Sequence, residues 1–408
     1  MLWCAICICI NYIFLGSADA ISNSVYSALV EMKADKSVQV LGSDTTNTMS
    51  GAEGGAQHYL EVKLNRNVFR VLCNLHTNEL PLRQLFKRLD GDTSGKDSFK
   101  GPIGKALKKV KTYKVKETFP AITAGDSIPT LSEEVTRDLS WDQKGLYKLL
   151  HSTRDGKSNS DIINMALGGL CHSRFTTLAE NLLYLNMCEH DLSPEDTANL
   201  ETLVYFIMTN FGPMWFAIKM KPLITDAPKH VFLQTKLMKL LPDNVQTIVK
   251  PFISKNAYYA HPEPLLLAML DDDNTEVRKQ AVDIILNIRR NQPSTSRPIR
   301  SYAVPTLLYD ADSYNTMIDW NAETLTEPPL TYHLTDDEIN HIVDEPLSVP
   351  PYRAHTQSIE RAVKLVTEAS GQVYELESAR GFIRSQVASR QLYIKADSRK
   401  ELIKMVKK

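Results

Sequence analysis

The stretch NVFRVLCNLHTNELPLRQLFKRL, residues 67–89, decides the fold class of this chain. Its first part, NVFRVLCNLH, predicts a strand, and it leads directly into NELPLRQLFKRL. In that second part Leu82, Leu85, Phe86 and Leu89 fall at i, i+3, i+4 and i+7, the spacing of one apolar helix face. A strand followed at once by an amphipathic helix is an α/β unit.

A further strand is predicted upstream of this unit. ISNSVYSALVEMK, residues 21–33, predicts a short helix, and SVQVLGSD, residues 37–44, alternates as a strand that ends at Asp44. The turn-forming TTNTMSGAEGG follows. The N-terminal part of the chain is therefore predicted to be α/β.

The composition changes from about residue 92. GDTSGKDSFKGPIGKALKKVKTYKVK is rich in Gly and Lys, and beyond Asp138 the apolar spacing is helical to about residue 290. Residues 261–290 have the two-helix pattern of a HEAT-type unit, but no second copy occurs, so we expect a helical hairpin inside a larger bundle. This order of segments predicts a helical domain inserted into one α/β fold, or separate domains.

The predicted divisions follow these changes in composition. They are an apolar leader (1–20), the first part of the α/β core (21–92), a Lys/Gly-rich connector (93–137), a helical insertion (138–290), a linker (291–304), the C-terminal part of the core (305–395) and a basic tail (396–408).

Overall composition narrows the class of protein. The chain has 408 residues, of which 43% are hydrophobic and 23% charged, as in a folded soluble protein. The formal net charge is −1, so overall charge does not indicate nucleic-acid binding. Only local basic patches can support such a function. The six cysteines form no pattern typical of a disulfide framework.

The leader MLWCAICICINYIFLGSADA is apolar and ends in small residues, Ala18-Asp19-Ala20. It has the length of a signal-peptide core, is too short for a comfortable membrane span and lacks a positive n-region. No Asn is followed at +2 by Ser or Thr, so the chain has no N-glycosylation sequon. One interpretation is that residues 1–20 direct secretion or anchor the protein in a membrane. The other is that they form a buried strand or reflect a misplaced start of the chain.

Three groups of residues are candidates for chemistry. Asp44 stands where a parallel strand would end, although Asp at such a point is more often a turn or helix-cap residue. Cys73 and His76 could be half of a metal site, but their spacing to the other Cys and His residues matches no closed tetrahedral pattern. By periodicity alone Glu360 lies on a solvated helix face with Lys364.

The strongest basic patch lies between residues 96 and 116, with Asp97 the only acid in it. Contact with a phosphate backbone is one interpretation, and solvated charge on a loop and short helix is the other. The lysines are Lys96, Lys100, Lys105, Lys108, Lys109, Lys111, Lys114 and Lys116.

Four motifs in order resemble the hAT superfamily of cut-and-paste DNA transposases, whose core is RNase H-like. They are LGSDTTNTMSG, VLCNLHTNELPLR, CHSRFTTLAENLLYL and AHTQSIERAVKLVTEAS. More narrowly, the chain resembles uncharacterised invertebrate proteins that carry such a core. The resemblance implies an α/β (RNase H-like) core interrupted by a large all-α insertion domain, in a chain that is mostly helical overall.

The resemblance also implies roles for individual residues. In such enzymes three carboxylates hold two Mg²⁺ ions roughly 4 Å apart, and Asp44 and Glu360 match the second and third of them. His76 matches a position that supports the core or holds the DNA end. Arg174 and Phe175 match residues that contact a phosphate and stack on an unpaired base.

Two departures weaken the catalytic part of the resemblance. The family's first aspartate lies on an earlier strand, and the only acid before Glu31 is Asp19, in the wrong context. Phe175 replaces the usual Trp. We therefore expect an N-terminally incomplete, degenerate DDE-type protein that is catalytically dead or nearly so, with Mg²⁺ as cofactor only if activity remains.

The expected partner is DNA, bound also by Lys105, Lys108, Lys109 and Lys111; self-association stays open, and no small-molecule substrate is evident. The resemblance implies a nuclear location. The rival reading is a helical protein-interaction scaffold with no nucleic-acid role, built on the HEAT-type hairpin and the helical middle.

Overall fold

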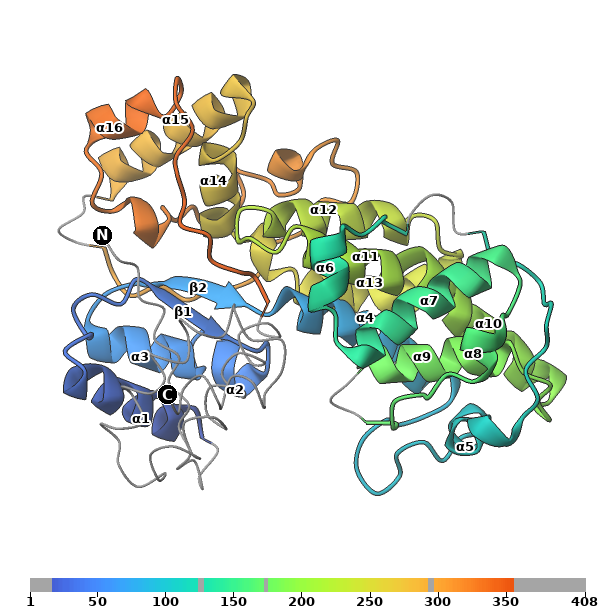
Figure 1. Ribbon diagram of the computed structural model, residues 1–408. Coiled ribbons are helices and arrows are strands. Elements are labelled where there is room, and N and C mark those ends of the chain that lie inside the picture. The colour runs from blue at the N-terminus through green and yellow to red at the C-terminus, as the bar shows by residue number, and fades with distance from the viewer. Residues whose placement is uncertain (1–16, 124–127, 172–174, 293–296, 356–408) are drawn as a thin grey trace, which may run out of the picture. The chain divides into compact units, whose positions relative to one another are not determined.

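The computed structural model describes residues 17–123, 128–171, 175–292 and 297–355 (Figure 1). The described chain is mostly helical and forms two compact units. One contains the residues up to Cys73 together with His355, and the other is Asn74–Ala354. Within these described residues, no helix combines the length and the apolar character needed to cross a membrane.

The first unit is a small α/β structure. In chain order its elements are α1 (Ala18–Glu31), β1 (Val40–Ser43), α2 (Asn47–Ser50), α3 (Ala56–Leu64) and β2 (Phe69–Leu72). The strands pair in parallel, with Val40 opposite Phe69 and Ser43 opposite Leu72. A parallel pair needs a crossover connection, which α2 and α3 provide. The predicted helix at 21–33 and the predicted strand at 37–44 are confirmed in α1 and β1.

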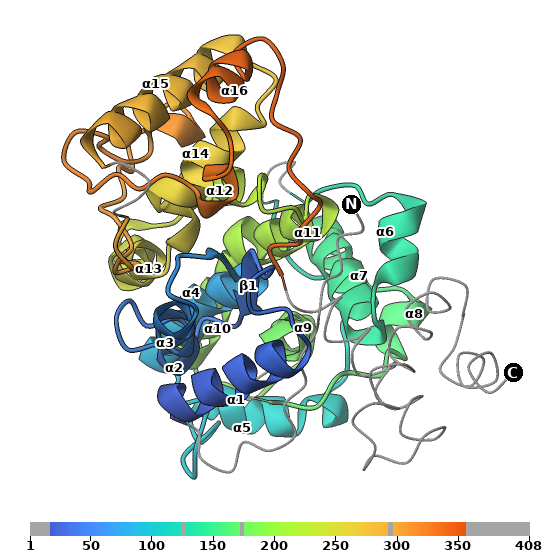
Figure 2. The ribbon, with the colours of Figure 1, turned by 90° about the vertical axis from the view of Figure 1, so that its left-hand side faces the viewer.

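An apolar cluster holds α1 and α3 against the sheet. Leu29 and Leu60 are each 3% exposed, and Leu41 of β1 packs against them. Figures 1 and 2 show both helices on the same side of the two strands. A buried ion pair between Glu61 and Arg70, with Oε2 and Nη2 2.5 Å apart, joins α3 to β2. The sequence between the strands therefore folds back onto them.

The second unit begins with α4 directly after β2. Its elements are α4 (Asn74–Leu89), α5 (Pro102–Lys108), η1 (Val110–Thr112), α6 (Glu133–Asp138), α7 (Trp141–Asp155), α8 (Ser160–Ile163), α9 (Phe175–Asn186), α10 (Pro194–Phe206), the π-helical η3 (Ile207–Phe211), α11 (Gly212–Met220), α12 (Ala227–Met238), α13 (Asp243–Lys255), η4 (Tyr258–Ala260), α14 (Pro262–Leu270), α15 (Thr275–Asn291), η6 (Tyr314–Thr316), η7 (Pro329–Thr331) and α16 (Asp336–His341).

Helix α4 is central to this unit, because it packs against α10, α11 and α13. Leu82, Leu85 and Phe86 are fully buried, which confirms the apolar face predicted from their spacing. The helix starts earlier than predicted: the strand ends at Leu72, not at His76. The Thr77 hydroxyl, 2.9 Å from Asn74 Oδ1, stabilises this early first turn.

A π-helical turn joins α10 to α11. Pro213 follows it, and since proline has no N–H it cannot donate to a carbonyl one turn earlier. Asn78 of α4 contacts the end of this turn, where its Nδ2 donates to the Phe211 carbonyl at 3.0 Å.

The predicted helical hairpin at 261–290 is confirmed as α14 and α15. Buried Arg278 of α15 donates to the carbonyls of Asp272, Asp273, Ile342 and Val343, and so ties the hairpin to the end of α16.

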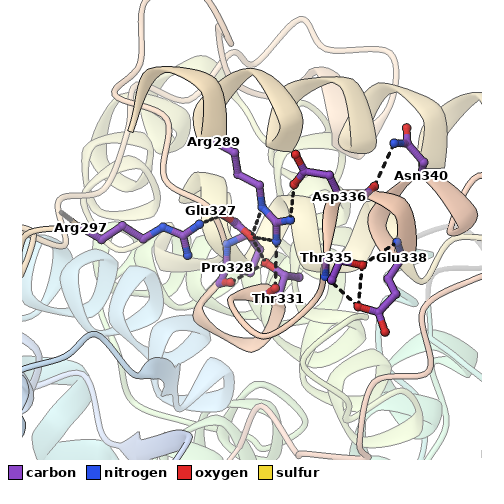
Figure 3. Close-up of polar contacts among 9 residues, drawn as sticks. All are labelled: Arg289, Arg297, Glu327, Pro328, Thr331, Thr335, Asp336, Glu338 and Asn340. Atoms are coloured by element: carbon purple, nitrogen blue, oxygen red, sulfur yellow. Dashed lines mark hydrogen bonds and ion pairs between the residues drawn. The ribbon is translucent and has the colours of Figure 1, made fainter. Parts of the chain in front are cut away.

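The segment predicted as a linker, 291–304, does not separate two units. Arg297 pairs with buried Glu327 at 2.5 Å, and Arg300 pairs with buried Glu263 at the same distance. Figure 3 shows Arg289 and Arg297 meeting at Glu327. These ion pairs hold residues 297–354 within the helical unit, whereas the sequence predicted residues 305–395 to be the C-terminal part of the α/β core.

Candidate nucleic-acid interface

The loop between α4 and α5 is fixed at both ends by Asp90. This buried carboxylate accepts hydrogen bonds from the Ile103 and Gly104 N–H groups, both at 2.7 Å, and so caps α5. Gly101 is required here because a Cβ would lie 2.0 Å from the Asp90 carbonyl oxygen. Phe99, in the left-handed region at φ 54°, buries its ring against Phe86. The loop is therefore anchored to the helical core.

Helix α5 has one buried face and one charged face. Ile103, Ala106 and Leu107 are at most 2% exposed, while Lys105 and Lys108 are exposed. Together with the lysines of the adjacent loop and η1 they form what we call the lysine surface: Lys96, Lys100, Lys105, Lys108, Lys109, Lys111, Lys114 and Lys116, all exposed except half-buried Lys116.

Three carboxylates neutralise part of this surface. Lys100 pairs with Asp97, Lys114 with Glu189 at 3.2 Å, and Lys109 with Asp191 at 2.9 Å. The Tyr113 hydroxyl also donates to Asp191. These bonds from Tyr113 and Lys109 lower the pKa of the Asp191 carboxyl to about 2.

The remaining lysines make no ion pair within the described chain. Among the described residues, the Lys108 ammonium hydrogen-bonds only to the Ser98 carbonyl, at 3.4 Å, and the Lys111 ammonium only to the Met165 carbonyl, at 3.3 Å. The surface therefore has an excess of positive charge, carried by Lys96, Lys105, Lys108, Lys111 and Lys116. Exposed ammonium groups in excess of carboxylates can neutralise the phosphates of a polyanion.

Phe175 does not provide a stacking face in this structure. Its ring is 2% exposed, at the start of α9, and the Arg83 guanidinium lies over it at 5.5 Å. Tyr113, which is half-buried between Lys111 and Lys114, has its hydroxyl bonded to Asp191, and the Lys109 ammonium lies over its ring at 5.3 Å. The chemistry of this surface is therefore electrostatic.

Asp44 follows β1 directly, at the carboxyl end of a parallel strand, as predicted. The side chain is exposed, and its Oδ1 accepts from the Thr46 N–H at 3.0 Å and from the Thr46 hydroxyl at 2.7 Å. Because Thr46 is the N-cap residue of α2, Asp44 also has the turn-stabilising role that the sequence left open.

Cys73 and His76 do not share one element. Cys73 is buried directly after β2, and its N–H donates to the Ser43 carbonyl. His76 is on α4, with its Nδ1 4.0 Å from Glu79 Oε2. In the part of the chain that the structure describes, no three His, Cys, Asp or Glu side chains gather to hold a metal ion.

Glu360 and Arg174 lie outside the described residues. Asp90 and Asp191, which organise the lysine surface, were not singled out from the sequence. The pair Asp90-Gly91 signals a turn, but nothing local to Asp191 points to Lys109, because 82 positions separate them.

Comparisons of the chain with protein-family models, with curated proteins and with solved structures found no match.

Proposed function

We propose that this chain binds nucleic acid through the lysine surface, by contact with the phosphate backbone. The observation that carries the proposal is the excess of exposed lysines on a short segment whose other face is buried. An anchored segment presents these charges without the entropy cost of ordering a loose chain. Duplex DNA is the expected ligand, since its closely spaced phosphates suit a surface that reads charge and not bases.

The finer fold assignment belongs to the same proposal. An RNase H-like core interrupted by a helical insertion is supported by the parallel strands β1 and β2, by Asp44 at the end of β1 and by the helical unit that follows β2. On this proposal the chain derives from a transposase of the hAT type.

We propose no efficient catalysis. Asp44 would contribute a hard oxygen ligand for Mg²⁺ together with Glu360, but Thr46 already occupies its Oδ1. DNA incubated with the protein and Mg²⁺ or Mn²⁺ is expected to stay uncut; metal-dependent cleavage that Glu360→Gln abolishes would contradict this.

The rival reading, a protein-interaction scaffold on the helical hairpin, has less support. Helix α16 packs against α15, and buried Arg278 of α15 donates to the Ile342 and Val343 carbonyls after α16, so this part of the hairpin is engaged within the chain itself.

Binding of a labelled DNA duplex by fluorescence anisotropy tests the proposal. We expect the variant with Lys96, Lys105 and Lys108 all changed to Gln to bind at least about tenfold more weakly at about 0.1 M salt. A matched control changes three other exposed lysines of the helical unit, Lys221, Lys255 and Lys279, to Gln. Both variants lose the same charge, so equal weakening in the two would exclude the lysine surface as the binding site.

A further inference from the structure

Glu180, in the middle of α9, is a fully buried carboxyl group. Among the described residues, its Oε1 has no hydrogen-bond partner and its Oε2 accepts only a long bond, 3.4 Å, from the Gly168 N–H. A Cβ on Gly145 of α7 would lie 2.1 Å from Oε1, so the carboxyl packs directly against the backbone of α7. A buried, poorly solvated carboxyl of this kind favours its neutral form.

The segment that covers Glu180 has no regular secondary structure. We call residues 165–171 the strap; it follows α8. Side chains of α9 bond to the strap and to the helix before it: Asn181 Nδ2 donates to the Gly168 carbonyl of the strap at 2.9 Å, and the Tyr184 hydroxyl donates to the Ile163 carbonyl at the end of α8 at 3.0 Å. A Cβ on Gly168 would lie 2.4 Å from Thr177 Cγ2, so the strap contacts α9 closely.

We propose that Glu180 is the proton-binding residue of a latch: its neutral carboxyl keeps the strap closed over α9, and loss of the proton releases the strap. In the closed form, the described residues would give an ionised Glu180 no donor at one oxygen and a single long hydrogen bond at the other. Opening the strap hydrates the carboxylate and removes that cost. This proposal does not depend on nucleic-acid binding.

The charged groups around Glu180 do not cancel the effect of burial on its pKa. Burial, the largest cause, and the Asp142 carboxylate on α7 raise the pKa of Glu180 from 4.5 to about 8, against the opposing effects of the Gly168 N–H and of Lys111 in η1. The other charged residues on elements packed against α9 are Lys144, Lys148, His151, Arg154 and Asp155 on α7, Glu195, Asp196 and Glu201 on α10, and Lys105 and Lys108 on α5.

The direction of the pH effect follows from this difference in proton binding. The closed form holds a proton up to about pH 8, whereas the open form loses it at the ordinary value near 4.5. Closure is therefore strongest below about pH 4.5 and weakens as the pH rises to about 8. Over the middle of that window, the opening constant rises by up to about tenfold per pH unit, and above pH 8 it levels off.

Hydrogen exchange of the strap, followed by mass spectrometry, tests the latch. At each pH the wild type is compared with Glu180→Gln, whose side chain has no proton to lose, and with the exposed control Glu201→Gln. Because the proteins are compared at the same pH, the intrinsic exchange rate of the amides cancels in each ratio. A peptide from α15 is the internal reference. We expect the ratio of strap exchange in the wild type to that in Glu180→Gln to rise from pH 5 to pH 8, while Glu201→Gln follows the wild type.

A second variant tests the contact with α7. Gly145→Ala should displace the carboxyl and raise strap exchange at pH 5.5, where the wild type is closed. A ratio of wild type to Glu180→Gln that is constant with pH, or normal strap protection in Gly145→Ala, would overturn the proposal.

Discussion

Two charged regions of the helical unit differ in how completely their charges are paired. In the Glu327 network, formed by Arg289, Arg297, Glu327, Thr331 and Asp336, the central carboxylate is 1% exposed and accepts bonds from two guanidinium groups and a hydroxyl (Figure 3). On the lysine surface, eight ammonium groups face three carboxylates.

Burial explains the difference. A charge removed from water must be paired. The charged groups of the Glu327 network are paired with one another, so few of them can bind a ligand. Water solvates the exposed lysines, so they can remain in excess without a large cost in stability. Exposed lysines in excess of carboxylates can bind the phosphates of a polyanion. The comparison therefore assigns a structural role to one region and a binding role to the other.

The largest expected effect is in the Glu327 network. Glu327→Gln removes the buried carboxylate shared by Arg289 and Arg297, whose side chains are each 11% exposed, and leaves Arg289 with the exposed Asp336 alone. It should lower the free energy of unfolding by roughly 3–5 kcal/mol. Urea denaturation measures this. The control Glu345→Gln changes an exposed carboxyl 3.8 Å from His341 and should cost less than about 1 kcal/mol. Equal, small losses would show that the network is not structural.

A smaller effect is expected at Asp90, the buried carboxylate beneath the lysine surface. Asp90→Ala leaves the Ile103 and Gly104 N–H groups uncapped and should cost about 1–2 kcal/mol in the same measurement. Asp97→Asn, which removes an exposed partner of Lys100, should change stability by less than about 0.5 kcal/mol. If the two variants were equally stable, Asp90 would not anchor the segment.

The smallest effect is expected at Asp191, where the ion pair is exposed. Its pKa is lowered to about 2, first by Tyr113 and then by Lys109, so the stability it contributes is present above its ordinary value of 3.8 and is lost as the pH falls toward 2. The thermal midpoint of Asp191→Asn should lie slightly below that of the wild type at pH 6, and the difference should vanish between pH 4 and pH 2. A difference that does not change with pH would contradict this assignment.

Local patterns predicted the parts of the fold that local physics determines. The i, i+3, i+4, i+7 spacing located the buried face of α4, and the apolar runs of 261–290 located the hairpin α14–α15. The alternation of residues 37–44 located β1, with Asp44 just beyond its end. Each of these signals lies within one helix or strand, or within two helices that follow each other in the chain.

Tertiary contacts determined the rest. Arg297 stands in a stretch rich in Pro, Ser and Thr that resembles a linker, and only its pairing with Glu327, 30 positions away, fixes it in the helical unit. The ring of Phe175 looked suitable for stacking on a base, but Arg83 of α4 covers it. Asp191 likewise reaches Lys109 only in the folded chain. The spacing of residues within one segment does not indicate which distant residues will contact it in the folded chain.

The salt dependence of DNA binding tests the central claim most directly, because it counts the phosphates that the lysines neutralise. For the wild type, log K should fall linearly with log salt concentration, by about 0.9 for each phosphate contact. Changing Lys96, Lys105 and Lys108 to Gln should make this slope shallower by about 2 to 3, while the control with Lys221, Lys255 and Lys279 changed keeps the wild-type slope. Identical slopes for the two variants would contradict the assignment of nucleic-acid binding to the lysine surface.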